Sequence, residues 1–132
     1  MDLPINIYIV DDDSDDIDFF HQAIASINIS IQCYSALNGE IGLRQLYTKV
    51  VPRPDCIFLD LNMPRINGKE FLERIKEDEE MNAIPVVIYS TSRHEKDKDE
   101  YLRLGAIDFL VKPTRLSDLQ QMLKESLSKI LK

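Results

Sequence analysis

The stretch CIFLD at residues 56–60 is a short apolar run that ends in a charged residue, and the chain repeats this pattern. The related stretches are INIYIVDD at 5–12 and IDFLVK at 107–112. Nearly continuous apolar runs are typical of parallel strands that helices cover on both faces. Because parallel strands end at one edge of the sheet, we expect Asp11, Asp12, Asp60 and Lys112 to lie together there.

Such a cluster of carboxylates opposes folding, so stability alone does not explain why the chain contains it. Two like charges about 4 Å apart repel by roughly 4 kcal/mol at an effective dielectric constant of about 20. We therefore interpret the cluster as a site for a hard cation and a phosphoryl group. The rest of the acidic run, Asp13, Asp15 and Asp16, is expected to be a solvated, helix-capping loop. An EF-hand calcium loop does not fit, because Asp16 stands at its glycine position and Gln22 at its final glutamate.

Strand-like and helix-like segments alternate along the whole chain. Strands are expected near 5–10, 31–35, 55–59, 85–89 and 107–111, with amphipathic helices between them. Asn67 with Glu70, and Ser92 with Glu95, are expected to form capping boxes that open the third and fourth helices. Gly105 is expected to end the fourth helix, and the second is expected to stop before Pro52. This alternation predicts an open, doubly wound α/β fold.

Composition narrows the possible functions. The chain has 132 residues, 44% of them hydrophobic, and a formal charge of -7, which argues against direct binding to nucleic acid. No apolar run approaches the ~18 residues of a membrane span, and the N-terminus does not resemble a signal peptide. Cys33 and Cys56 lie in apolar runs and are expected to be buried, reduced thiols. We expect a cytoplasmic protein without membrane contact.

Four motifs in order resemble the receiver domain of two-component response regulators. They are Val10-Asp11-Asp12, then Leu59-Asp60-Leu61-Asn62-Met63-Pro64 with Gly68, then Ser90, and finally Lys112-Pro113. The resemblance covers essentially the whole chain. It implies a flavodoxin-like (βα)5 fold whose five-stranded parallel sheet has the strand order 2-1-3-4-5. Residues 1–132 would then form a single receiver domain.

The resemblance also implies a role for each motif residue. Asp60 would accept the phosphoryl group, and Mg²⁺ would be held by Asp11, Asp12, Asp60 and the backbone carbonyl of Asn62. Lys112 and Ser90 would contact phosphoryl oxygens, and Phe109 would be the aromatic switch. A cis bond is implied between Lys112 and Pro113.

Some positions depart from the usual receiver pattern. Ser90 replaces the commoner threonine, Thr91 is often a smaller residue, and Phe109 lacks the hydroxyl of the frequent tyrosine. Asn62 and Ser92 occupy places that resemble the family's controls on phosphoryl lifetime, which the sequence leaves open.

The predicted function is a stand-alone receiver that a histidine kinase or histidine phosphotransfer protein phosphorylates on Asp60. Its output would be contact with an unknown downstream protein, or relay of the phosphoryl group, as a monomer or a phosphorylation-dependent dimer. One alternative is a receiver fold that only binds a partner. Another is a haloacid-dehalogenase-like phosphatase, although Asn62 stands where that chemistry needs an aspartate.

Overall fold

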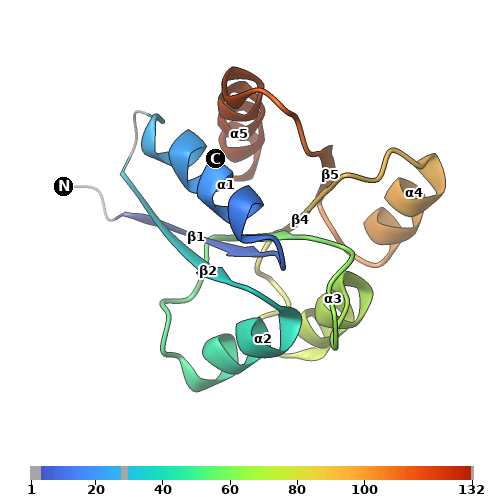
Figure 1. The fold of residues 1–132 in the computed structure, drawn as a ribbon. Coiled ribbons are helices and arrows are strands. Elements are labelled where there is room, and N and C mark those ends of the chain that lie inside the picture. Colours follow the sequence, from blue (N-terminus) through green and yellow to red (C-terminus); the bar gives the residue numbers. More distant parts are fainter. Residues whose placement is uncertain (1–3, 28–29, 132) are drawn as a thin grey trace.

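The fold is built on a twisted parallel sheet (Figure 1), seen in a computed structural model that describes residues 4–27 and 30–131. The strands are β1 (Ile5–Val10), β2 (Ile31–Ala36), β3 (Cys56–Leu59), β4 (Val86–Ser90) and β5 (Asp108–Val111). They pair in parallel in the order β2-β1-β3-β4-β5. The predicted strands and their order are confirmed, with boundaries within one residue of those expected.

Helices follow every strand and cover both faces of the sheet. They are α1 (Ser14–Ala25), α2 (Gly39–Thr48), α3 (Gly68–Glu77), α4 (Glu95–Arg103) and α5 (Leu116–Ile130). Figure 1 shows α1 and α5 together on one face, with α2 and α3 on the other. The doubly wound α/β fold predicted from the alternation of segments is therefore present.

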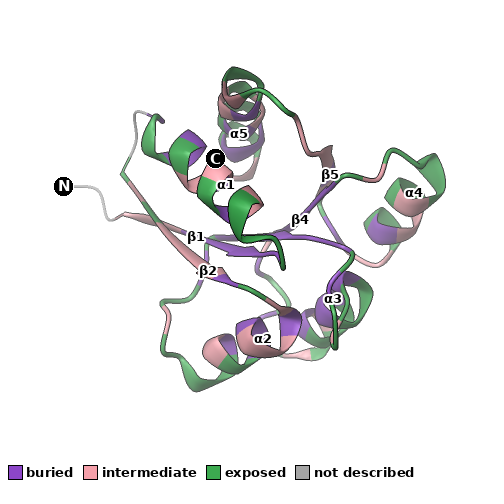
Figure 2. Cartoon of the chain, in the orientation of Figure 1, coloured by how far each residue is buried: buried purple, intermediate pink, exposed green. Residues whose placement is uncertain are grey.

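Side-chain alternation along the strands divides the core into two halves. In β1, Ile7 and Ile9 join the cluster under α1 and α5, whereas Tyr8 and Val10 join the cluster under α2, α3 and α4. Figure 2 shows the strands at the centre of the sheet buried along most of their length. Because β1, β3 and β4 have neighbours on both edges and helices on both faces, their apolar runs are continuous.

The edge position of β2 corrects one expectation. Cys56 in β3 is fully buried as predicted, but Cys33 in β2 is only half-buried. β2 pairs with β1 alone, so its outer edge has no strand to cover it. Both cysteines are free thiols.

The helix boundaries agree with three of the local signals and correct a fourth. Asn67 caps α3 by accepting a hydrogen bond from the Glu70 backbone N–H, which is one half of the expected capping box, while the Glu70 carboxylate lies 4.0 Å from Arg74. Gly105 follows α4 with φ of 110°. By contrast, α4 begins at Glu95 after His94, so Ser92 is not its N-cap. The second helix stops before Pro52 as expected; it ends at Thr48, where Lys49 turns into the left-handed region with φ of 60°.

Within the described residues, no helix has the length and apolar character that crossing a membrane requires.

Candidate functional site

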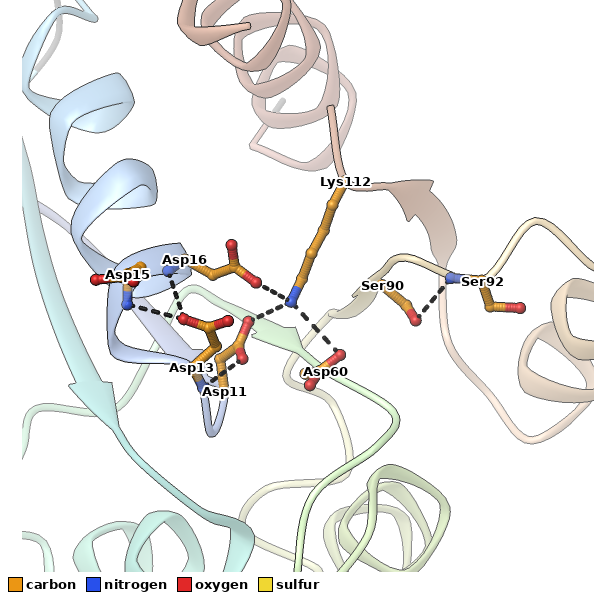
Figure 3. Close-up of polar contacts among 8 residues, drawn as sticks. All are labelled: Asp11, Asp13, Asp15, Asp16, Asp60, Ser90, Ser92 and Lys112. Carbon is orange, nitrogen blue, oxygen red and sulfur yellow. Dashed lines mark hydrogen bonds and ion pairs between the residues drawn. The ribbon is translucent and has the colours of Figure 1, made fainter. Parts of the chain in front are cut away.

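The carboxyl edge of the sheet brings the predicted site residues together (Figure 3). Asp11 follows β1, Asp60 follows β3 and Lys112 follows β5. The backbone fixes their spacing, because Asp60 N–H donates to the Val10 carbonyl at 2.9 Å and Lys112 N–H donates to the Ser90 carbonyl at 2.8 Å. These residues lie far apart in sequence, and the strand register alone makes them neighbours.

Three carboxylates form a cluster that suits a small, hard cation. One oxygen from each of Asp11, Asp12 and Asp60 lies within 4.8 Å of the others. Asp11 is 1% exposed and Asp60 7%, whereas Asp12 faces solvent. Asp11 Oδ2 is buried and receives no well-directed hydrogen bond, although the Lys112 ammonium lies 2.8 Å away. A buried carboxylate oxygen without a donor can serve as a metal ligand, and Mg²⁺ prefers such oxygens.

Lys112 is the buried cation of the site. Its Nζ lies 2.8 Å from Asp11 Oδ2, 2.8 Å from Asp16 Oδ2 and 3.7 Å from Asp60 Oδ1. The side chain is only 8% exposed. The ammonium also lies 5.5 Å from the centre of the Tyr89 ring, a distance at which a cation and an aromatic face attract. Lys112 therefore offsets part of the repulsion among the acids.

Asp16 corrects the sequence interpretation of the acidic loop. It was expected to be a solvated helix cap, but its carboxylate contacts Lys112. Asp13 does cap α1, because its side chain accepts from the backbone N–H groups of Asp15 and Asp16 at 2.9 and 3.2 Å. The contact of Asp16 depends on how the first turn of α1 faces the sheet edge, and the acidic composition of the loop does not encode that orientation.

Ser90 is fully buried at the end of β4 and is linked to α4. Its hydroxyl oxygen accepts a hydrogen bond from Ser92 N–H at 3.2 Å. The Ser92 hydroxyl in turn donates to Asp97 Oδ2 at 2.6 Å, in the first turn of α4. Thus Ser92, expected as a helix cap, instead connects the serine at the strand end to the helix.

The loop after Asp60 is shaped by a close backbone approach. A Cβ atom at Gly68 would lie 2.7 Å from the Asp60 carbonyl oxygen and 2.8 Å from Leu61 Cα. Only glycine fits there without moving the backbone that carries Asp60. Asn62, in the same loop, is exposed between the buried Leu61 and Met63.

The remaining predicted residues have mixed outcomes. Phe109 is buried in the cluster on the α4 side of the sheet, and Thr91 is exposed. The expected cis bond is wrong, because the peptide bond between Lys112 and Pro113 is trans, like the others in the described residues. A proline permits the cis form but still favours trans by about 0.5–1 kcal/mol, and Lys112 reaches the acids with the trans bond.

Burial and mutual repulsion shift the ionisation of the site. Burial, together with the charges of nearby Asp11 and Asp12, raises the pKa of Asp60 to about 7, and Lys112 opposes this shift. Burial also raises the pKa of Asp11, again against the influence of Lys112. Burial by itself would lower the pKa of Lys112, but its contacts with Asp11 and Asp16 raise it overall.

These shifts predict that the metal-free protein loses stability as the pH rises toward 7. The unfolded chain releases the Asp60 proton near its ordinary pKa of 3.8, whereas the folded protein keeps it until about 7. Between these values a rising pH favours unfolding, because only the folded state still binds the proton. We expect the unfolding free energy in EDTA to fall by about 1–2 kcal/mol between about pH 5 and 7.5.

Urea unfolding at both pH values measures this change. Mg²⁺ should reverse it at about pH 7.5, because a cation stabilises the ionised carboxylates. Asp60→Asn should remove most of the pH dependence, while Asp118→Asn, on the exposed side of α5, should keep it. If the unfolding free energy of Asp60→Asn depended on pH as steeply as that of the wild type, the proton would belong to another group.

Comparisons with known proteins agree with this geometry. Residues 7–124 match the family described as the response regulator receiver domain. The response regulator Rcp1 of Synechocystis is 40% identical over 73 residues, which are 55% of this chain and 50% of Rcp1. The KdpE transcriptional regulatory protein of Escherichia coli is 31% identical over 122 residues, 92% of this chain and 51% of KdpE. The chain thus aligns with about half the length of these relatives.

Solved structures share the fold over nearly the whole chain. The phosphorylated cyanobacterial phytochrome response regulator RcpA superposes with a TM-score of 0.88 at 31% identity, covering 98% of this chain and 95% of RcpA. The Mn²⁺-bound form of Rcp1 gives 0.84 at 29% identity, covering 95% of this chain and 93% of Rcp1.

Proposed function

Because the chain belongs to the response regulator receiver domain family, we propose that it acts as a receiver phosphorylated on Asp60. The donor would be a histidine kinase or a histidine phosphotransfer protein. One observation carries the proposal: Asp60 lies at the sheet edge beside two further carboxylates, with the Lys112 ammonium 3.7 Å away. RcpA, whose fold is so similar, is described as phosphorylated.

Asp11, Asp12, Asp60 and the backbone carbonyl of Asn62 would hold Mg²⁺. The acid cluster and the buried Asp11 oxygen, which accepts no well-directed hydrogen bond, fit such an ion, and Rcp1 was solved with Mn²⁺. When bound, the ion would supply positive charge that offsets the repulsion between the acids and an anionic phosphoryl donor.

The chain's own residues would do the rest of the transfer. An Asp60 carboxylate oxygen forms a bond to phosphorus while the bond from phosphorus to the donor's histidine nitrogen breaks, and the leaving imidazole keeps the electron pair. Lys112 would place its ammonium beside the transferred group and neutralise part of its charge. Burial around Asp60 limits the water that competes for the phosphoryl group.

The link from Ser90 to α4 offers a route from phosphorylation to output. A phosphoryl group adds strong acceptor oxygens at Asp60. If the Ser90 hydroxyl turns to donate to one of them, its hydrogen bond from Ser92 N–H changes as well. Because the Ser92 hydroxyl donates to Asp97, the change extends to α4. It also extends to a shallow cleft beside α4, whose lining includes Ser92, Arg93, His94 and Phe109. We propose the face formed by α4, β5 and α5 as the surface for a downstream protein.

Beryllofluoride with Mg²⁺ mimics the phosphoryl group and tests the proposal. We expect saturable binding, with amide shifts in NMR spectra at Ser90, in the first turns of α4 and along β5. Beryllofluoride without Mg²⁺, and the Asp60→Asn variant with both, should give no such shifts. Failure of the wild-type protein to bind would contradict the proposal, and binding without shifts in α4 or β5 would favour a receiver fold that does not switch.

A further inference from the structure

Asp16 gives Lys112 a second close counter-ion besides Asp11. Its Oδ2 lies 2.8 Å from the ammonium, as near as Asp11 Oδ2 and nearer than Asp60 Oδ1 at 3.7 Å. Figure 3 shows the Asp16 and Asp11 carboxylates on one side of the ammonium and Asp60 on the other. The ammonium is therefore drawn toward α1 and away from the carboxylate that would carry the phosphoryl group.

The position of Asp16 is fixed by the start of α1. Its backbone N–H donates to the capping side chain of Asp13, which orients the first turn of the helix. Its side chain is 35% exposed, whereas that of Asp11 is 1% exposed. Asp16 also stands outside the cluster of three acids that could hold a metal ion. When that cluster binds a cation, Asp16 is the carboxylate that continues to attract Lys112.

We propose that Asp16 is a positioning residue that competes with the phosphoryl group on Asp60 for the Lys112 ammonium. The inference rests on the proposed function and adds a control on how strongly the site retains a phosphoryl group. The Lys112 ammonium donates a hydrogen bond to Asp16 and lies equally close to Asp11, at 2.8 Å from an oxygen of each. A phosphoryl oxygen must attract the ammonium across the 3.7 Å gap against the pull of Asp16, so the Asp16 charge weakens the phosphorylated state.

If Asp16 had the opposite role, its removal would change the binding of a phosphoryl group in the opposite direction. If Asp16 instead held Lys112 in the orientation that the phosphoryl group needs, its removal would loosen the lysine and weaken binding. The buried stem of Lys112 and its place beside the Tyr89 ring argue against that role, because packing already orients the side chain.

Beryllofluoride binding at saturating Mg²⁺ separates these roles. We expect Asp16→Asn to bind beryllofluoride about three- to tenfold more tightly than the wild type. Its phosphorylated form should lose phosphate more slowly by a similar factor. Asp15→Asn is the matched control, because it removes the same charge one residue earlier from an exposed side chain. Its affinity for beryllofluoride and its rate of phosphate loss should stay within about twofold of the wild-type values. The same is expected of Asp16→Glu, which keeps the charge.

A metal-free measurement tests the ion pair itself. Urea unfolding of Asp16→Asn, Lys112→Met and the double variant forms a double-mutant cycle. We expect the two changes to be non-additive by about three- to tenfold in the unfolding equilibrium constant.

Several outcomes would contradict the competition between Asp16 and the phosphoryl group for Lys112. Weaker or unchanged beryllofluoride binding by Asp16→Asn, equal effects of Asp15→Asn, or an Asp16→Glu variant that behaves like Asp16→Asn would overturn the competition. Additive effects in the cycle would overturn the contact on which it depends. If the wild type binds no beryllofluoride at all, the proposed function fails, whereas normal wild-type binding with unaltered variants defeats only the role of Asp16.

Discussion

Asp60→Asn is expected to abolish covalent phosphorylation of the protein. With Mg²⁺ and a small acyl-phosphate donor, the wild type should gain the mass of one phosphoryl group and the variant none. The neutral amide keeps the shape of the side chain but loses the nucleophilic carboxylate oxygen, so the expected loss of rate is at least about 100-fold. Intact-protein mass spectrometry measures the result directly.

The arrangement of the other acids explains why none should replace Asp60. Asp11 is fully buried, its Oδ2 faces Lys112 and its Oδ1 accepts from the Asp13 backbone N–H. Asp12 is exposed. Asp118→Asn, at an exposed residue of α5 outside the cluster of three acids, should be phosphorylated like the wild type. A phosphoryl mass that persists in Asp60→Asn would move the acceptor to another residue, with Asp11 and Asp12 as the first candidates.

The sheet and the main site residues could be predicted because their signals are local. Each apolar run is short and ends where the chain must turn, and parallel pairing then places the residue after each strand at a common edge. Asn67 was predictable as a cap for the same reason, since a cap involves residues three apart on one helix turn. Asp11, Asp60 and Lys112 follow from this logic without knowledge of any side-chain conformation.

The missed contacts depend on how elements sit against each other. Asp16 reaches Lys112 because α1 packs with its first turn over the sheet edge, a relation between residues 96 apart in sequence. Ser92 matched the pattern of a cap, but its hydroxyl donates to Asp97, five residues on, after the chain has turned away from β4. The exposure of Cys33 depends on β2 being an edge strand, which follows from strand order and not from the residue's own neighbours.

Charge balance connects stability and function in this site. Three acids and one lysine meet where the fold excludes much of the solvent. Burial and the charge of Asp11 raise the pKa of Asp60, and the same buried negative charge favours the binding of a cation. Lys112, which stabilises the metal-free protein, would later contact the phosphoryl group. Substitutions here should therefore change folding and phosphorylation together, and each experiment needs a stability measurement beside the functional one.

Lys112→Met is expected to cause the largest loss of stability of the variants considered. Methionine keeps much of the length of the side chain but removes the charge, so Asp11 and Asp60 stay buried without their cation. Removing one partner of a buried ion pair typically costs about 3–5 kcal/mol. Protonation of the acids offsets part of this, so we expect a loss of about 2–4 kcal/mol in EDTA at about pH 7.5.

The pH and metal dependence of Lys112→Met identify the cause of that loss. Without the lysine, the pKa values of both acids rise further above their ordinary values, so only the folded variant binds protons as the pH rises from about 5. The deficit should therefore shrink at about pH 5 and grow above 7, and Mg²⁺ should reduce it at either pH. Lys69→Met, whose lysine is 49% exposed and pairs with Glu100 at 3.6 Å, should lose under about 1 kcal/mol with no such dependence. A Lys112→Met deficit that is equal at both pH values and insensitive to Mg²⁺ would attribute the loss to packing, because uncompensated carboxylates must respond to protons and to cations.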